Sequence, residues 1–404
     1  MKAVMYGGGN IGRGFIGALF SASGYRVTFV DVAKPVVESL NEKGSYPVRI
    51  LKGATYEDVD VQNVCAVDGN DQNAVAQAIA EADIMATAVG VNILKFIIGN
   101  LVAGIRLRKA QNGGKLNILI CENLMDANKV LEKMLKEHLN EEEIAWFDEN
   151  IGLVEASIGR MVPVQTEEMK DGNPMRVCVE SYGFLPVDKD AFKGEIPAIR
   201  SMVPFSPFDF YLKRKLYIHN MGHATCAYLG DLLGLPYIYQ AIDVPQIRIV
   251  VENAMMESAV ALSKKYGVEL ADIRNHIEDL LFRFTNEALK DTCQRVGGDP
   301  ARKLSPADRL VGASKLAVEQ GVCPCFMAIG GGAALYRYIK ESENAVQSVE
   351  RAKEVLLSVS GLCAEDETAV RMLHFYEMIV GGADLSALLK DAECMKAAAR
   401  TNVI

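Results

Sequence analysis

Residues 2–14 read Lys2-Ala-Val-Met-Tyr-Gly7-Gly-Gly9-Asn-Ile-Gly12-Arg-Gly14, and this stretch decides the fold of the first half of the chain. A short apolar run leads directly into a turn with GxGxxG spacing, and a helical pattern follows. In such a turn Gly7 permits a tight bend, Gly9 lets the backbone approach a pyrophosphate, and Gly12 allows close packing of helix on strand. The helix N-terminus then receives the anion. The stretch therefore predicts a dinucleotide-binding βαβ unit, with Asn10 and Ile11 among the cofactor contacts.

A carboxylate completes this fingerprint. Asp31 stands 19 residues after Gly12, at the end of the second predicted strand, where it can accept hydrogen bonds from the adenosine ribose. The same charge would repel a 2′-phosphate, and the next residues, Val32 and Ala33, offer no arginine to receive one. We therefore expect NAD rather than NADP. A flavin or a nucleotide sugar would use similar glycine geometry.

The rest of the pattern indicates an α/β fold with a second, helical domain. Predicted strands at 2–6, 26–31, 84–88, 117–121 and 151–154 alternate with helical stretches, as in a Rossmann-type doubly wound parallel sheet. Residues 176–180 alternate like an exposed strand. Long helices follow at 244–266, 270–287, 346–360 and 365–380, and Gly330-Gly331-Gly332 is interpreted as a turn between helices. For 404 residues we predict an NAD-binding domain over 1–200 and a mainly helical substrate and catalytic domain over 201–404.

Composition excludes several classes of partner. The net charge of −9 disfavours nucleic acid and anionic membrane, and we find neither a signal segment nor a membrane span. The nine scattered cysteines favour a reduced, cytoplasmic protein, and we interpret Cys323-Pro324-Cys325 as two buried thiols.

Three polar residues in the second half suggest a catalytic helix. Lys215, Asn220 and His223 lie at offsets of five and eight, which on an α-helix places them within about 140° of arc. A buried lysine with hydrogen-bonding neighbours can serve as the base that removes a proton from a secondary alcohol. His219 and His223 could instead share a metal ion, but no HExxH glutamate or third ligand stands nearby, so we expect no metal.

These features together resemble the polyol-specific long-chain dehydrogenases, the mannitol dehydrogenase family. The matching segments span residues 1 to about 310 and are residues 7–17, 87–90, 121–123, 160–163, 215–223, 227–230, 295–297, 302–305 and 308–310. The resemblance implies that Lys215 is the general base, that Asn123 and Asn220 polarise the substrate oxygen, and that His223 positions the hydroxyl. It further implies a cofactor contact at Val89, polyol contacts at Arg295 and Lys303, and a monomer.

The choice of substrate rests on the overall resemblance, which favours interconversion of D-mannitol 1-phosphate and D-fructose 6-phosphate. A sugar phosphate would need cations, and those available are Arg295, Arg302, Lys303 and Arg309, although such a cluster can equally be a solvated helix face. Many family members have Asp where this chain has Gly159, a departure that bears on the substrate contacts more than on the reaction. Free mannitol, arabinitol or a hexuronate stay open as substrates, as does a non-catalytic NAD-binding sensor.

Overall fold

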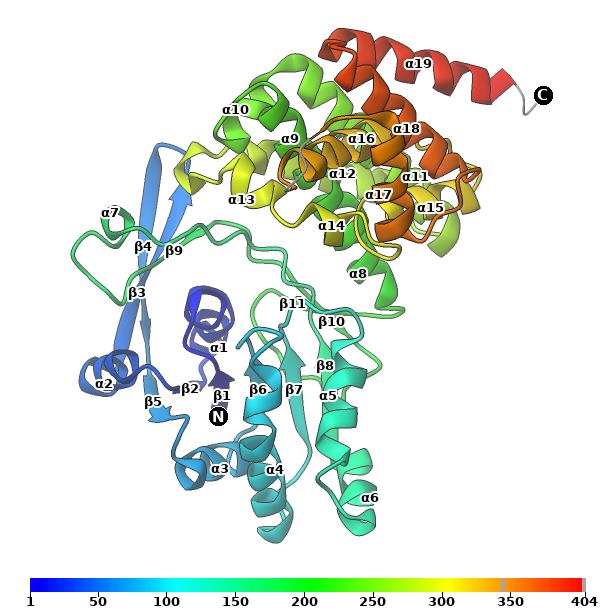
Figure 1. Cartoon of the computed structure of the whole chain (residues 1–404). Helices are drawn as coiled ribbons and strands as arrows, with labels where there is room; N and C mark the ends of the chain where they lie inside the picture. The colour runs from blue at the N-terminus through cyan, green and yellow to red at the C-terminus, as the bar shows by residue number, and fades with distance from the viewer. Residues whose placement is uncertain (343–345, 402–404) are drawn as a thin grey trace. The chain divides into compact units, whose positions relative to one another are not determined.

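A computed structural model describes residues 1–342 and 346–401, and the chain divides into two compact units, Met1–Asp209 and Phe210–Ile404 (Figure 1). The division falls a few residues beyond the boundary near residue 200 that the sequence predicts. Among the described residues, no helix is both long and apolar enough to span a bilayer.

The first unit is built on a six-stranded parallel sheet in the order β5-β2-β1-β6-β7-β8. The strands are β1 (Lys2–Tyr6), β2 (Arg26–Asp31), β5 (Val64–Asp68), β6 (Ile84–Thr87), β7 (Leu116–Ile120) and β8 (Ile151–Glu155). The order reverses between β1 and β6, and ligands of such sheets bind beyond the carboxyl ends of the strands at this point. The predicted doubly wound fold is confirmed.

Helices pack against both faces of this sheet. One face packs against the first helix, formed by η1 (Gly12–Ile16) and α1 (Gly17–Ala22), and against α2 (Lys34–Lys43). The other face packs against α3 (Gln72–Ala80), α4 (Leu94–Ala110), α5 (Ala127–Lys136) and α6 (Glu141–Asn150). Because β1 alternates, Ala3 and Met5 join the first cluster while Val4 and Tyr6 join the second.

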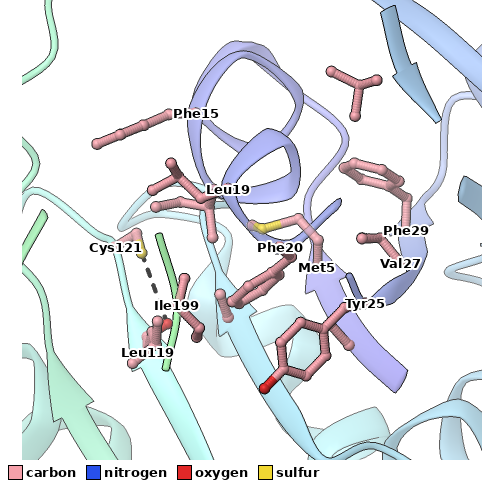
Figure 2. Packing of buried hydrophobic residues seen from close by; sticks show 14 of the residues in the cluster. Met5, Phe15, Leu19, Phe20, Tyr25, Val27, Phe29, Leu119, Cys121 and Ile199 are labelled. Atoms are coloured by element: carbon pink, nitrogen blue, oxygen red, sulfur yellow. Dashed lines mark hydrogen bonds between the residues drawn. The ribbon is translucent and has the colours of Figure 1, made fainter. Parts of the chain in front are cut away.

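Figure 2 shows the first cluster from close by. Leu19 and Phe20 of α1 pack with Met5, Phe29 and Leu119 of the sheet, and Phe20 and Phe29 are fully buried. Burying a side chain of this size contributes roughly 1.5–3 kcal/mol. This packing fixes the helix that follows the glycine loop firmly against the strands.

Two smaller sheets complete the first unit. β3 (Ser45–Lys52) pairs with antiparallel β4 (Thr55–Gln62) and with parallel β9 (Val177–Glu180), while β10 (Leu185–Asp188) pairs with β11 (Met202–Phe205); α7 (Glu167–Lys170) precedes β9. The prediction of an exposed strand at 176–180 is wrong in its exposure. All of β9 is buried, because its residues Val177 and Val179 join the core that receives the first helix.

The secondary-structure elements described for the second unit are all helices (Figure 1). Its elements are α8 (Asp209–Arg214), η2 (Lys215–Asn220), α9 (Met221–Leu232), α10 (Ile238–Asp243), α11 (Pro245–Tyr266), α12 (Leu270–Phe284), η3 (Glu287–Leu289), α13 (Cys293–Gly297), α14 (Pro300–Lys303), α15 (Val311–Glu319), α16 (Cys325–Lys340), α17 (Val349–Ser360), α18 (Glu367–Val380) and α19 (Leu385–Thr401). Helix α8 starts at the last residue of the first unit.

The glycine triplet lies inside α16, so its interpretation as a turn between helices is wrong. A Cβ atom on Gly330 would lie 2.4 Å from Thr225 Oγ1 of α9, and one on Gly331 would lie 2.6 Å from Met372 of α18. A Cβ on Gly332 would meet the backbone of Tyr376 at 2.8 Å. The glycines are there because two neighbouring helices approach the α16 backbone too closely for any side chain.

Candidate functional site

The glycine loop has the geometry that a pyrophosphate requires. Gly7 has φ +104° and donates its N–H to the Val30 carbonyl at 2.9 Å, so the chain turns sharply at the end of β1. A Cβ on Gly12 would lie 1.9 Å from the Gly7 carbonyl oxygen, whereas a Cβ on Gly9 would meet nothing within 4 Å. Gly12 is therefore required for packing, and Gly9 leaves the backbone open to a ligand.

Two arginines donate hydrogen bonds to backbone carbonyls in and around this loop. Arg13 is buried and donates to the carbonyls of Gly8 and Met175, both at 2.6 Å, and burial lowers its pKa. Arg160 donates to the Gly14 carbonyl at 2.9 Å and lies over the Phe15 ring. These guanidinium groups bind backbone oxygens, so they hold the shape of the loop.

Asp31 is tied to the glycine loop as well as placed for a ribose. Its carboxylate accepts the N–H of Gly8 at 2.7 Å and that of Ala33 at 2.9 Å, and the side chain is half-buried at the end of β2. A carboxylate has about four acceptor positions, so capacity is left for ribose hydroxyls.

Replacing Asp31 by alanine is expected to weaken NAD binding about 10- to 100-fold, since hydrogen bonds to a charged group are worth about 1.5–3 kcal/mol. The preference for NAD over NADP should also shrink, because the repulsion of a 2′-phosphate is gone. Titration with NADH and NADPH measures both effects. Asp31→Asn serves as the control, because it keeps an acceptor for the loop and removes only the charge. Unchanged discrimination in both variants would mean that the ribose contact is assigned wrongly.

The loop that follows β6 is held by a carboxylate that the sequence did not lead us to select. Glu122 is buried, and its two oxygens accept the N–H groups of Val89 at 3.0 Å and Gly90 at 2.8 Å. Val89 is one of the predicted cofactor contacts, and exposed Asn123 directly follows Glu122 after β7. Glu122 could have been identified from the sequence, because it is a carboxylate next to a candidate oxyanion donor at the carboxyl end of a parallel strand.

Glu122→Gln should raise the KM for NAD about 10-fold, because one loop N–H then faces an amide NH₂ and loses a hydrogen bond to a charged acceptor. The first unit should stay folded, since the change is isosteric. Coenzyme titration together with a thermal melt separates the two effects. Glu81→Gln, at an exposed glutamate of the same unit, is the matched control.

The predicted catalytic helix is not a regular α-helix. Residues Lys215–Asn220 form the π-helical segment η2, which continues into α9 with His223 in its first turn. A π-helix is closed by i→i+5 hydrogen bonds, so residues five apart lie nearly on the same face of the helix. Lys215 and Asn220 are therefore closer together around the helix than the predicted α-helical spacing places them. Such π segments occur often at functional sites. All three side chains are half-buried.

His223 is held by an acidic residue that also holds a predicted substrate contact. Its Nε2 lies 3.3 Å from Asp291 Oδ2, and its ring stacks on Phe284 with centroids 4.8 Å apart. Arg295 Nε donates to Asp291 Oδ1 at 2.8 Å. Burial opposes ionisation of Asp291, but His223 and Arg295 outweigh it, so its pKa lies below the usual value. Asp291 therefore contacts two candidate site residues, His223 and Arg295. In the sequence, the i,i+4 spacing of Asp291 and Arg295 is the feature that could have indicated this contact.

His219 lies deeper than His223. It is buried, and burial followed by the nearby charges of Arg283 and of neighbouring basic groups holds its pKa well below the usual range. The two imidazole rings are 6.0 Å apart between centroids. In residues 1–342 and 346–401, no three His, Cys, Asp or Glu side chains are grouped as a metal would need.

The candidate phosphate cations all have internal partners. Arg302 pairs with Asp299 at 2.8 Å and with Asp308 at 3.0 Å, and Arg309 pairs with Asp308 at 2.7 Å. Lys303 is 3% exposed and donates to the Gly298 carbonyl; burial, then the charges of Arg309 and Arg302, lower its pKa to about 8. A phosphate here would have to share cations that carboxylates already engage.

Gly159 is in close contact with an aromatic ring. A Cβ atom at this position would lie 2.9 Å from Tyr182 Cε1. An aspartate at this position would therefore require Tyr182 to move.

A parallel sheet with a glycine loop, followed by a helical unit, is the architecture of two-domain nucleotide-dependent dehydrogenases. The chain belongs to the mannitol dehydrogenase family: residues 1–201 match the mannitol dehydrogenase Rossmann domain, and residues 208–373 match the mannitol dehydrogenase C-terminal domain. The resemblance seen in the sequence is thus confirmed.

Similar proteins cover most of the chain. It is 38% identical over 345 residues to mannitol-1-phosphate 5-dehydrogenase of Thermoanaerobacter pseudethanolicus, covering 85% of this chain and 88% of that one. Identity to the enzyme of the same name from Brevibacillus brevis is 38% over 346 residues, covering 85% and 88%. The fold matches that of Pseudomonas fluorescens mannitol 2-dehydrogenase in its ternary complex with NAD and D-mannitol, with a TM-score of 0.75, 16% identity and coverage of 97% and 94%. It also matches a substrate-free D-sorbitol dehydrogenase, with a TM-score of 0.81, 14% identity and coverage of 96% and 94%.

Proposed function

We propose that this protein is an NAD-dependent polyol-phosphate dehydrogenase that interconverts D-mannitol 1-phosphate and D-fructose 6-phosphate. The observation that carries the proposal is the 38% identity, across both domains, to relatives named mannitol-1-phosphate 5-dehydrogenase. The retained set of Lys215, Asn220 and His223 supports turnover, because a protein that only sensed NAD would have no evident need for all three.

The residues of the first domain fit NAD. The open backbone at Gly9, with Asn10 and Ile11 after it, would receive the pyrophosphate, and the carboxylate of Asp31 would receive the ribose. Val89, held by Glu122, would border the other half of the cofactor. NAD supplies the acceptor for the hydride that leaves the alcohol carbon.

In the second domain, Lys215 removes the hydroxyl proton of the polyol through its neutral amine, and in the reverse direction its ammonium returns that proton. Asn220 donates its amide N–H to the substrate oxygen as negative charge develops there, and Asn123 is proposed as a second donor. His223, fixed by Asp291 and Phe284, orients the hydroxyl. With a base and two donors, this scheme requires no metal.

Arg295 and Lys303 are proposed to contact the polyol phosphate, although both have internal partners. Four cations, Arg295, Arg302, Lys303 and Arg309, stand against three carboxylates, Asp291, Asp299 and Asp308, so an excess of positive charge remains. Because carboxylates already pair with these cations, a second candidate is also favoured, namely the same chemistry on an unphosphorylated polyol or hexuronate.

The test is oxidation of NADH by purified, EDTA-treated protein with D-fructose 6-phosphate, compared with D-fructose and with NADPH. We expect turnover with the phosphate ester and NADH. Equal activity with fructose would move the assignment to a free polyol. If NADH bound without turnover of any family substrate, the protein would instead be a sensor.

A further inference from the structure

Cys323 and Cys325 stand close together just before and at the start of α16. Their Sγ atoms lie 2.7 Å apart. A disulfide bond is about 2.05 Å long, so the two sulfurs need to approach by less than an ångström to be joined. Pro324 between them limits the freedom of the connecting backbone. The sequence led us to expect two buried thiols; Cys325 is buried, whereas Cys323 is half-buried.

The two thiols differ in how a reagent could reach them. Cys325 is fully buried, whereas Cys323 is half-buried and lines a cavity of about 590 Å³. Other residues of the cavity wall include Met256, Val260, Lys264 and Lys396. A cavity of this size admits a small organic molecule. Cys323 lines the cavity and Cys325 is not among its lining residues, so a reagent that enters the cavity reaches Cys323.

Charge also distinguishes the two sulfurs. The hydrogen bond with Cys325 lowers the pKa of Cys323 to about 7; burial and Glu367 oppose this shift, and Arg371 assists it. The same contact, together with burial, raises the pKa of Cys325. Since the thiolate is the nucleophilic form, Cys323 is the sulfur that attacks and Cys325 the one that resolves.

We propose that Cys323 and Cys325 form a dithiol redox site that reduces low-molecular-weight disulfides and is itself converted to an intrachain disulfide. The Cys323 thiolate attacks one sulfur of the small disulfide, which forms a mixed disulfide and releases one thiolate. Cys325 then attacks Sγ of Cys323, forming the Cys323–Cys325 bond and releasing the second thiolate. The protein loses two electrons, the small disulfide gains them, and the two cysteine protons pass to the two released thiolates.

This reaction would act on the centre of the helical unit. Cys325 is the first residue of α16, and the next two N–H groups, of Phe326 and Met327, bind the buried carboxyl group of Glu257 at 3.0 Å. The disulfide would therefore link the start of this central helix covalently to the segment that precedes it.

The experiment treats the reduced full-length protein with oxidised glutathione, quenches it with an alkylating reagent, and analyses tryptic peptides by mass. Both cysteines fall on the peptide of residues 316–337. We expect this peptide to lose both alkylatable thiols and to be lighter by two hydrogens than the reduced form. Cys325→Ser should instead accumulate a glutathione adduct on Cys323, and Cys323→Ser should leave Cys325 unmodified.

Cys363→Ser and Cys394→Ser, at the exposed cysteines, are controls that should leave the internal disulfide unchanged. The proposal is overturned if wild-type peptide 316–337 remains fully alkylatable, if it keeps a stable glutathione adduct, or if Cys323→Ser reacts as the wild type does. The readout is covalent, so it does not depend on the catalytic assignment.

Discussion

Lys215→Ala is expected to lower kcat for reduction of D-fructose 6-phosphate by about 10²- to 10⁴-fold, the range that general acid–base catalysis contributes. Affinity for NADH should change little, because the lysine belongs to the second domain and acts on the substrate proton. Steady-state kinetics measures the first quantity, and quenching or enhancement of NADH fluorescence measures the second.

Two further measurements make this prediction specific. Lys213→Ala removes a lysine two residues earlier in α8 and should keep kcat close to that of the wild type. Adding a small primary amine to Lys215→Ala should restore part of the rate, since the amine can carry the proton. An unchanged kcat in Lys215→Ala would eliminate the mechanism.

Asn220→Asp should reduce kcat by more than about 10²- to 10³-fold, which is the cost of only removing one donor from an oxyanion site. The aspartate is nearly isosteric with asparagine, so η2 should keep its shape, but its negative charge would stand where charge develops on the substrate oxygen. Asn220→Ala removes the donor without adding that charge, and it should be less impaired than Asn220→Asp. The order of kcat values in these two variants is the test, and the reverse order would show that Asn220 does not face the reacting oxygen.

The first domain was predictable because its signals are local. The bounds of β1 and β2 agree with the predicted strands, and β6, β7 and β8 agree within a residue or two at each end. Each of these strands is a short apolar run beside a turn, and parallel strands buried on both faces produce that pattern whatever surrounds them. The long helices α11, α12, α17 and α18 were likewise visible as amphipathic stretches.

Features that depend on packing were predicted wrongly or missed. The hairpin of β3 and β4 was not identified, and β9 was expected to be exposed, because its burial comes from the first helix packing on it. The triplet Gly330–Gly332 was taken for a turn because glycine breaks isolated helices. In the folded unit, close approach of α9 and α18 outweighs that preference.

By itself the sequence determined the glycine loop and predicted its carboxylate at Asp31 and the set of Lys215, Asn220 and His223, because these depend on residue type and spacing along one segment. Only the tertiary structure decided that Glu122 holds the Val89 loop, that Asp291 joins His223 to Arg295, and that two cysteines face each other beside a cavity. Except for the two cysteines, those partners are far apart along the chain or on different elements. Spacing encodes which side chains share a helix face, whereas distances between elements are set by how the cores pack.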